Sequence, residues 1–422
     1  MYESRKEIMP HVYLTYLPAK KFKTSCFSAH FVTPLSRETA GYNALLPAVL
    51  RRGTMRCPDM VSLSAALDRL YGAQIDYTVR KKGERQCVGF VATTIDDAFA
   101  PGGEKLLESA ADLMGQLFLD PVTRNGRLLP DYVESEKQNL IDAIRSIRND
   151  KRDWADLRLM REMCASEPYG VLRLGDEKTV KSINNQKLHR HYQELLSASR
   201  LEIFYCGSAE ESRVRDAMLS AFAALPRGAV QPCPPILRRE APAEPRYVTE
   251  SMDVTQGKLS MGWRCGSDDL PAMIMANLMF GGTSNSKLFL NVREKLSLCY
   301  YASSSYARSK GIMTVSSGIE TADYDKALGE ILHQLDEVRL GHWEDWEFDG
   351  ALATMLSSLD SLPDSQGAME NYYLGQAATE QHETPEELAA MLREVTPQRV
   401  RAAAESAVLD TVYFLKGKEE QA

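Results

Sequence analysis

The sequence predicts an α+β protein made of two homologous halves, each a largely antiparallel or mixed sheet with helices packed on one face. Three observations predict this. The chain has 422 residues, more than one ordinary hydrophobic core accommodates. A proline-rich segment lies near its middle, and helical and strand periodicities follow one another in the same order on both sides of that segment. We therefore expect domains at 1–225 and 247–422, joined by a linker at 226–246.

The element pattern is clearest in the first half. Pro58 and Asp59 are typical of a helix start, and apolar residues follow at helical spacing (Met60, Leu63, Leu67 and Leu70). Beyond them, apolar and polar residues alternate, as in a half-buried strand (Ile75, Tyr77 and Val79). Lys82-Gly83 then predicts a turn into a return strand. A second amphipathic helix is expected from Glu104 to Phe118.

Different features of the sequence predict the linker and the duplication. Six prolines without an apolar period between them favour an extended, solvated segment (Pro226, Pro232, Pro234, Pro235, Pro242 and Pro245). On its two sides, Arg52-Gly53-Thr54 corresponds to Gly281-Gly282-Thr283, each followed by a helix, alternating strands and a further helix. The matching order indicates a diverged tandem duplication.

Charge and cysteine usage exclude several classes of function. Lys and Arg total 50 against 58 Asp and Glu, a formal charge of −8, so nucleic acid is not an expected partner. No apolar run approaches the length of a membrane helix, and no secretory signal is apparent, so we expect no membrane partner. The eight cysteines are scattered without a CxxC pair, which favours reduced core thiols and a cytoplasmic location.

The segment Ala40–Thr54 resembles the metal-binding helix of pitrilysin/insulinase-type zinc peptidases, the inverzincins, and the chain also resembles their bacterial YfmF-type branch. In that family, H-x-x-E-H supplies two zinc ligands and a general base. Counted back from Gly53-Thr54, those positions hold Ala44, Pro47 and Ala48. The family's third ligand, a Glu on a later helix, falls on Ala143 in the helix that begins near Glu136. The resemblance therefore implies a lost zinc site, with no metal, no cofactor and no catalytic residue in this chain.

A second stretch, Ser286–Tyr300, is similar to the family's S-x-L-F-x-x-V-R-E-K-x-x-L-x-Y pattern. By that resemblance, Arg293 and Tyr300 are substrate-binding residues. A guanidinium fork and a phenol also suit a peptide carbonyl or its oxyanion on chemical grounds alone. The alternative is that Arg293 pairs with a nearby carboxylate and Tyr300 packs in a strand.

The family's architecture implies that this chain is half of a peptidase clamshell. We expect an inactive homologue, not an enzyme on its own, that pairs with a zinc-bearing homologous subunit to enclose and position a peptide or small protein. It is also a possible homodimer when alone. One rival is a structural or binding module of a complex with no role in proteolysis, and another is a peptidase with a relocated metal site.

Overall fold

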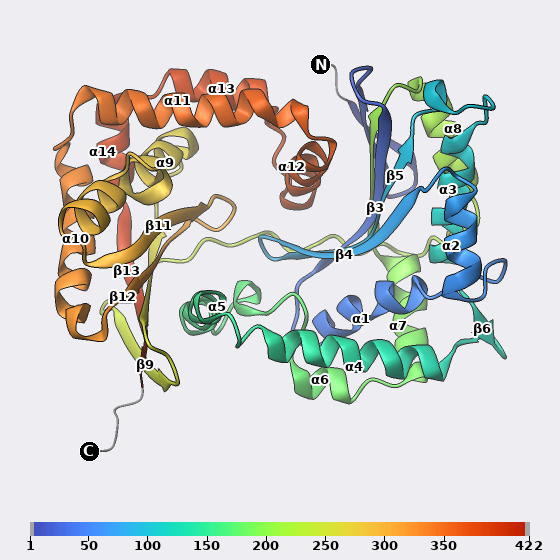
Figure 1. Cartoon of the computed structure of the whole chain (residues 1–422), viewed down its shortest axis with the longest axis horizontal. Coiled ribbons are helices and arrows are strands. Elements are labelled where there is room, and N and C mark those ends of the chain that lie inside the picture. Colours follow the sequence, from blue (N-terminus) through green and yellow to red (C-terminus); the bar gives the residue numbers. More distant parts are fainter. Residues whose placement is uncertain (1–3, 418–422) are drawn as a thin grey trace. The chain divides into compact units, whose positions relative to one another are not determined.

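The computed structural model describes residues 4–417, which form two compact units drawn in Figure 1. Unit 1 comprises Met1–Arg145, Val171–Pro234 and Asp364–His382. Unit 2 comprises Ser146–Gly170, Pro235–Pro363 and Glu383–Ala422. Each compact unit is built from three separate segments of the chain. The two halves predicted from the sequence are instead consecutive segments, so the units and the halves are different divisions of the chain. The boundaries 1–225, 226–246 and 247–422 stay a prediction about the duplication.

Unit 1 contains a six-stranded mixed sheet in the order β1-β2-β8-β3-β5-β4. All neighbouring strands are antiparallel except β2 and β8, which are parallel. Its strands are β1 (Ser4–Met9), β2 (Val12–Pro18), β3 (Thr24–Pro34), β4 (Gln74–Lys82), β5 (Arg85–Ile95) and β8 (Arg200–Gly207), with a small hairpin of β6 (Thr123–Arg124) and β7 (Arg127–Leu128). Its helices are α1 (Ala40–Leu50), α2 (Met60–Asp68), η1 (Asp97–Phe99), α3 (Leu106–Leu119), α4 (Pro130–Ser146), α6 (Glu177–Lys181), α7 (Asn185–Ala198), α8 (Glu211–Ala221) and α12 (Gln366–Thr379).

Unit 2 contains a five-stranded mixed sheet in the order β11-β12-β10-β13-β9, in which only β13 and β9 are parallel. Its strands are β9 (Arg246–Met252), β10 (Gly257–Cys265), β11 (Cys299–Ala307), β12 (Ile312–Ile319) and β13 (Ala407–Gly417). Its helical segments are α5 (Lys151–Met163), η2 (Pro168–Gly170), α9 (Leu270–Asn277), η3 (Leu278–Gly282), η4 (Leu288–Lys295), η5 (Thr321–Asp323), α10 (Tyr324–Leu340), α11 (Asp345–Ser361), η6 (Leu362–Asp364), α13 (Pro385–Arg393) and α14 (Pro397–Glu405).

The two sheets share one topology. In unit 1 the order β4-β5-β3-β8-β2 runs from an antiparallel edge to a parallel pair, and in unit 2 β11-β12-β10-β13-β9 does the same. In each unit an early strand of one half pairs in parallel with the last strand of that half. This correspondence confirms two similar α+β halves and fits the duplication predicted from sequence.

Each half contributes one helix to the sheet of the other half's unit. Helix α5 comes from the N-terminal half and packs on β10 and β13 in unit 2, and α12 comes from the C-terminal half and packs on β8 and β3 in unit 1. The colours of Figure 1 make this visible, because orange α12 lies beside the blue strands of unit 1. Each sheet therefore has a set of helices over one face and a single exchanged helix on the other.

Local sequence signals explain several element ends. The Asp59 carboxylate accepts from the Ser62 backbone N–H at 2.7 Å, and the Ser62 hydroxyl oxygen accepts from the Asp59 backbone N–H. These two hydrogen bonds form a capping box at the start of α2. Gly83 has a φ of 57° in the turn between β4 and β5, a conformation that glycine adopts without a Cβ penalty. Both features confirm the predicted helix start and turn.

The helices and strands of each unit enclose a separate apolar core. Within residues 4–417 no two cysteines are joined in a disulfide, and all eight except the half-buried Cys233 are buried, as expected for small core residues. The segment 225–245 contains no helix or strand. None of the helices between residues 4 and 417 is long and apolar enough to cross a bilayer.

Candidate functional site

Helix α1 carries the three positions that correspond to the first metal-binding motif. Ala44 and Ala48 are only 3% and 7% exposed, and Pro47 between them is buried as well. The helix packs against β4, β5, α6 and α7 of the same unit. Methyl groups and a proline ring offer no lone pair to a metal, so these positions contribute packing and no coordination chemistry.

A buried network of neutral side chains fixes α1 in place. Asn43 donates to Gln86 Oε1 at 2.9 Å and accepts from the ring of His191 through its Oδ1 at 2.6 Å. Gln86 in turn donates to the backbone oxygen of Ala40 at 3.0 Å. Burial lowers the pKa of His191 to about 4, which keeps its ring neutral. The neutral ring therefore serves as a hydrogen-bond partner for Asn43.

Helix α4 carries the fourth position, and the structure places Ala143 on its exposed surface. Glu136 is the buried carboxylate of this helix, but it accepts from Arg52 Nη1 at 2.9 Å and from Asn139 at 3.0 Å. Asp142 is exposed and accepts from Gln138 at 3.0 Å. Both carboxylates are thus engaged by neighbouring donors. Among residues 4–417, no three His, Cys, Asp or Glu side chains are grouped so that they could hold a metal ion.

Arg293 lies near the end of η4 in unit 2, and its side chain is 41% exposed. Its guanidinium lies 4.7 Å from the centre of the Phe289 ring, which is one helical turn earlier, and its Nε lies 3.6 Å from Glu294 Oε1. A guanidinium stacked on an aromatic ring is restrained in direction while its outer N–H groups remain available. The pairing with Glu294 is exposed and contributes little to stability.

Tyr300 lies at the beginning of β11, the edge strand of the sheet, and is 58% exposed. In the pairing of β11 with β12, Cys299 faces Ile319 and Tyr301 faces Gly318, so Tyr300 is the extra residue of a β-bulge. A bulge bends the strand and turns the extra side chain away from the regular alternation. The Tyr300 phenol donates to Glu320 Oε1 at 2.9 Å, and this hydrogen bond raises the pKa of Tyr300.

The predicted site residues therefore fall into two groups. The four motif positions lie in unit 1 and offer no ligand, whereas Arg293 and Tyr300 lie in unit 2 on either side of a short turn at Leu296–Leu298. Ser297 in that turn has a φ of 51°. Within residues 4–417, no hydrogen bond or ion pair joins Arg293 to Tyr300. Arg293 presents exposed N–H donors, which suit a carbonyl oxygen, whereas the exposed Tyr300 phenol donates its O–H to Glu320.

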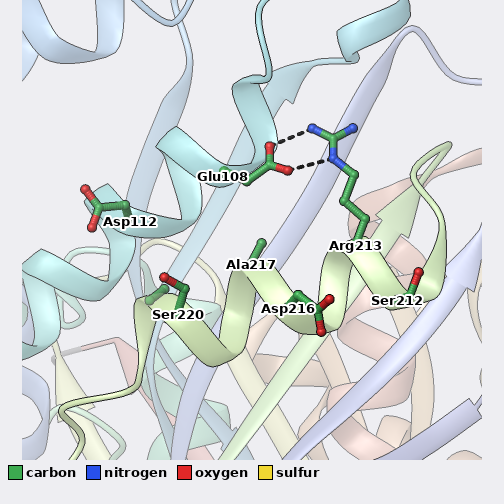
Figure 2. Close-up of a pocket in the computed structure, with 8 residues that line it drawn as sticks. Glu108, Asp112, Ser212, Arg213, Asp216, Ala217 and Ser220 are labelled. Atoms are coloured by element: carbon green, nitrogen blue, oxygen red, sulfur yellow. Dashed lines mark hydrogen bonds and ion pairs between the residues drawn. The ribbon is translucent and has the colours of Figure 1, made fainter.

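Sequence reasoning did not anticipate two hollows in unit 1. Figure 2 shows one of about 450 Å³ between α3 and α8, lined by residues such as Asp112, Asp216 and Ser220. Its Glu108 carboxylate is held by Arg213 at 2.6 Å. The other, of about 310 Å³, is lined by His11, Tyr13, Arg200 and Cys233 among others. Neither hollow includes a predicted site residue.

Comparison with known proteins agrees with the absence of metal ligands at the four motif positions. Residues 182–355 match the family model described as the peptidase M16 inactive domain. The chain is 32% identical to the probable inactive metalloprotease YmfF of Bacillus subtilis over 95% of its own length and 94% of that protein. Both matches confirm the expected resemblance to a non-catalytic homologue of these peptidases.

Solved structures show the same fold. A conserved protein from Enterococcus faecalis superposes with a TM-score of 0.90 at 27% identity, with all of both chains covered. A peptidase M16 inactive domain from Pseudomonas fluorescens superposes with a TM-score of 0.81 at 17% identity, covering 100% of this chain and 99% of that one. The likeness extends over the whole chain.

Proposed function

The chain belongs to the M16 peptidase family as an inactive homologue, and from this premise we propose that it is the non-catalytic subunit of a heterodimeric peptidase. Its partner is a zinc-bearing homologue of similar size. In this proposal the partner supplies the metal and the general base, and this chain completes the enclosure around a peptide and holds it through Arg293 and Tyr300.

The observation that carries the proposal is the contrast between the two groups of site residues. The positions needed to activate water hold Ala44, Pro47, Ala48 and Ala143. The positions suited to holding a peptide backbone hold an arginine and a tyrosine, whose side chains are 41% and 58% exposed. A chain with no role in proteolysis has no need to retain this pair, whereas a positioning subunit does.

The chemistry divides in the same way. Hydrolysis of an amide near neutral pH requires an activated water, which a bound metal and a carboxylate base supply. Polarisation of the peptide carbonyl requires only aligned hydrogen-bond donors. Arg293 and Tyr300 can serve the second requirement and none of the four motif positions can serve the first. In this proposal the partner supplies the activated water and this chain supplies the hydrogen-bond donors, and together they form one complete site.

Reconstitution tests the proposal. The chain is purified alone and together with a homologue from the same genome that carries H-x-x-E-H, and each preparation is incubated with a peptide library. We expect no cleavage by the chain alone, a 1:1 complex by light scattering, and cleavage that is faster in the complex than with the zinc-bearing homologue alone. A complex whose cleavage rate does not depend on this chain would favour the rival, a structural module. Self-association without binding of the homologue would contradict the heterodimer.

A further inference from the structure

Part of one face of the unit 2 sheet is polar and partly exposed. On β10 and β12, Leu259, Met261 and Val315 point into the apolar core, so their neighbours in the strands point to the opposite face. Helix α5 covers the β13 side of that face, where Ala155 and Leu159 pack on Tyr413 and Leu415. On the β11–β12 side the same face presents serine and threonine hydroxyls of partly or fully exposed residues (Ser303, Ser305, Thr314 and Ser316) beside the Tyr301 ring, whose own hydroxyl oxygen is buried.

Two cations converge on one ring of this hydroxyl face. The Arg152 guanidinium lies 4.4 Å from the centre of the Tyr301 ring, and Lys258 Nζ lies 5.6 Å from it. Arg152 Nη2 also donates to Ser303 Oγ at 3.1 Å. These contacts hold the two positive groups beside the hydroxyl row and restrict how far they can turn away from it.

A glycine makes this arrangement possible. Gly318 faces Tyr301 across the strands, and a Cβ at position 318 would lie 2.6 Å from Tyr301 Cε1 and 3.3 Å from Lys258 Nζ. Any larger residue would displace the ring from the sheet. The sequence therefore leaves room for the Tyr301 ring and the Lys258 ammonium over the same point of β12.

Neither cation is neutralised by direct contact. Within residues 4–417, no carboxylate forms an ion pair with Arg152 or Lys258, and the acceptor of Lys258 is the neutral Gln256 at 3.3 Å. Asp150 and Asp156 lie close enough to interact with Lys258 and Arg152 through space, but their hydrogen bonds go to other partners. Asp150 caps α5 by accepting from backbone N–H groups, and Asp156 accepts from Ser260 at 2.7 Å. Two positive charges on a partly exposed surface favour a negatively charged ligand.

This cluster adjoins a residue of the proposed peptide site. Gln256, the acceptor of Lys258, is also within hydrogen-bonding reach of the Tyr300 phenol. Tyr300 and Tyr301 are consecutive, and the bulge separates the directions of their side chains. If the backbone of a peptide is held at Tyr300, the peptide's side chains next to that point would therefore lie near Lys258.

We propose that Arg152, Lys258, Tyr301 and Ser303 form a subsite for a carboxylate, the Asp or Glu side chain of a bound peptide. The inference rests on the proposed function, because it assumes that this chain binds peptides. Arg152 offers a planar fork that matches a carboxylate, Lys258 adds a second charge, Ser303 offers a hydroxyl, and the Tyr301 ring supports the two cations. The subsite makes the peptidase prefer acidic residues near the point where the substrate backbone is held.

The test uses the reconstituted complex and two labelled peptide libraries that differ only by Glu or Gln at one scanned position. We expect tighter binding of Glu peptides at one register, by about tenfold, and loss of that preference at high salt. Lys258→Met and Arg152→Gln should each bring the Glu peptides close to the affinity of the Gln peptides and leave the Gln peptides unchanged. Lys326→Met, an exposed lysine on α10, is the matched control.

The outcomes separate the two proposals. Binding of both libraries without a preference for Glu, or a preference that survives both substitutions, overturns the subsite and leaves the proposed function standing. Absence of binding by either library overturns the subsite together with the proposed function. Ser303→Ala is a milder variant for the case in which a charge substitution disturbs folding, and a smaller loss of the Glu preference is expected from it.

Discussion

Ser28 on β3 donates a hydrogen bond of 2.9 Å to Glu370 on α12, a fully buried carboxylate whose helix comes from the opposite end of the chain. Arg80 on β4 also pairs with Glu370, and His30 Nδ1 lies 3.6 Å from it. The exchanged helix is thus attached to the sheet of unit 1 through one carboxylate that meets three polar side chains.

Removing that carboxylate should loosen α12. Glu370→Ala leaves the Arg80 charge and the Ser28 hydroxyl without their acceptor, and we expect a loss of about 2–4 kcal/mol in the free energy of unfolding of unit 1. Urea denaturation followed by circular dichroism measures the loss, and hydrogen exchange should show the α12 amides opening first. Glu380→Ala, at the exposed end of the same helix, should cost less than about 1 kcal/mol. Equal losses in the two variants would contradict this account.

His30 should make unit 1 sensitive to acid. It is completely buried, and burial lowers its pKa to about 4, below the ordinary value of 6.5. Between those two values the unfolded chain binds a proton that the folded chain does not, so stability falls as the pH drops from about 6.5 toward 4. The expected loss from this residue is about 2 kcal/mol at pH 5.

The measurement compares urea midpoints at several pH values for the parent protein and His30→Gln. The variant should start less stable but lose less on acidification, because glutamine does not titrate. His333→Gln, which replaces an exposed histidine on α10, is the matched control. An NMR titration of the His30 ring provides a second readout, and a midpoint near 6.5 would refute the prediction.

The sequence predicted the fold class but not how the halves share helices. The cap at Asp59 and the turn at Gly83 could be predicted because each depends on residues next to it in the chain. The position of α12 could not, since an apolar helix pattern does not identify which sheet the helix covers. Ser28 and His30 on β3 are polar residues buried only because α12 covers that face.

The candidate site was predicted to a similar extent. A family resemblance identified positions 44, 47, 48 and 143 and the pair Arg293 and Tyr300. The bulge at Tyr300 could not be predicted. Tyr300 and Tyr301 are adjacent and identical, so the alternation of inward and outward side chains along β11 does not show which of them is the extra residue. The packing of Arg293 on Phe289 follows from helical spacing and could have been predicted.

Restoring the metal-binding residues should not restore activity. In the variant Ala44→His, Pro47→Glu, Ala48→His and Ala143→Glu, two imidazoles must enter positions that are almost fully buried. Overpacking of this kind costs about 1–3 kcal/mol per site, and the second shell that orients zinc ligands is not in place. We expect a lower melting temperature, little cleavage of peptides, and far less than one zinc per molecule in both parent and variant.

Elemental analysis after dialysis against a mild chelator measures the zinc. Ala143→Glu alone, at an exposed position, should change stability by less than about 0.5 kcal/mol and serves as the control. Stoichiometric zinc in the parent protein would instead support the rival with a relocated metal site. Efficient cleavage by the fourfold variant would show that the surrounding structure still supports catalysis.

Arg293 and Tyr300 should matter for cleavage by the complex and not for its assembly. Arg293→Ala and Tyr300→Phe each remove an exposed donor, and we expect kcat/KM to fall by up to about 10²–10³-fold if the donor acts on the oxyanion and by less if it holds the substrate backbone. The two side chains are 41% and 58% exposed, so their replacement should leave the melting temperature nearly unchanged. Steady-state kinetics on the reconstituted complex measures kcat/KM, and light scattering confirms that the complex has assembled.

Arg393→Ala and Tyr247→Phe are the matched controls. They remove an exposed arginine and an exposed tyrosine elsewhere in unit 2 and should have no effect on cleavage. If the complex forms and all four variants cleave at the parental rate, positioning of substrate is not the task of this chain, and the structural module becomes the better description.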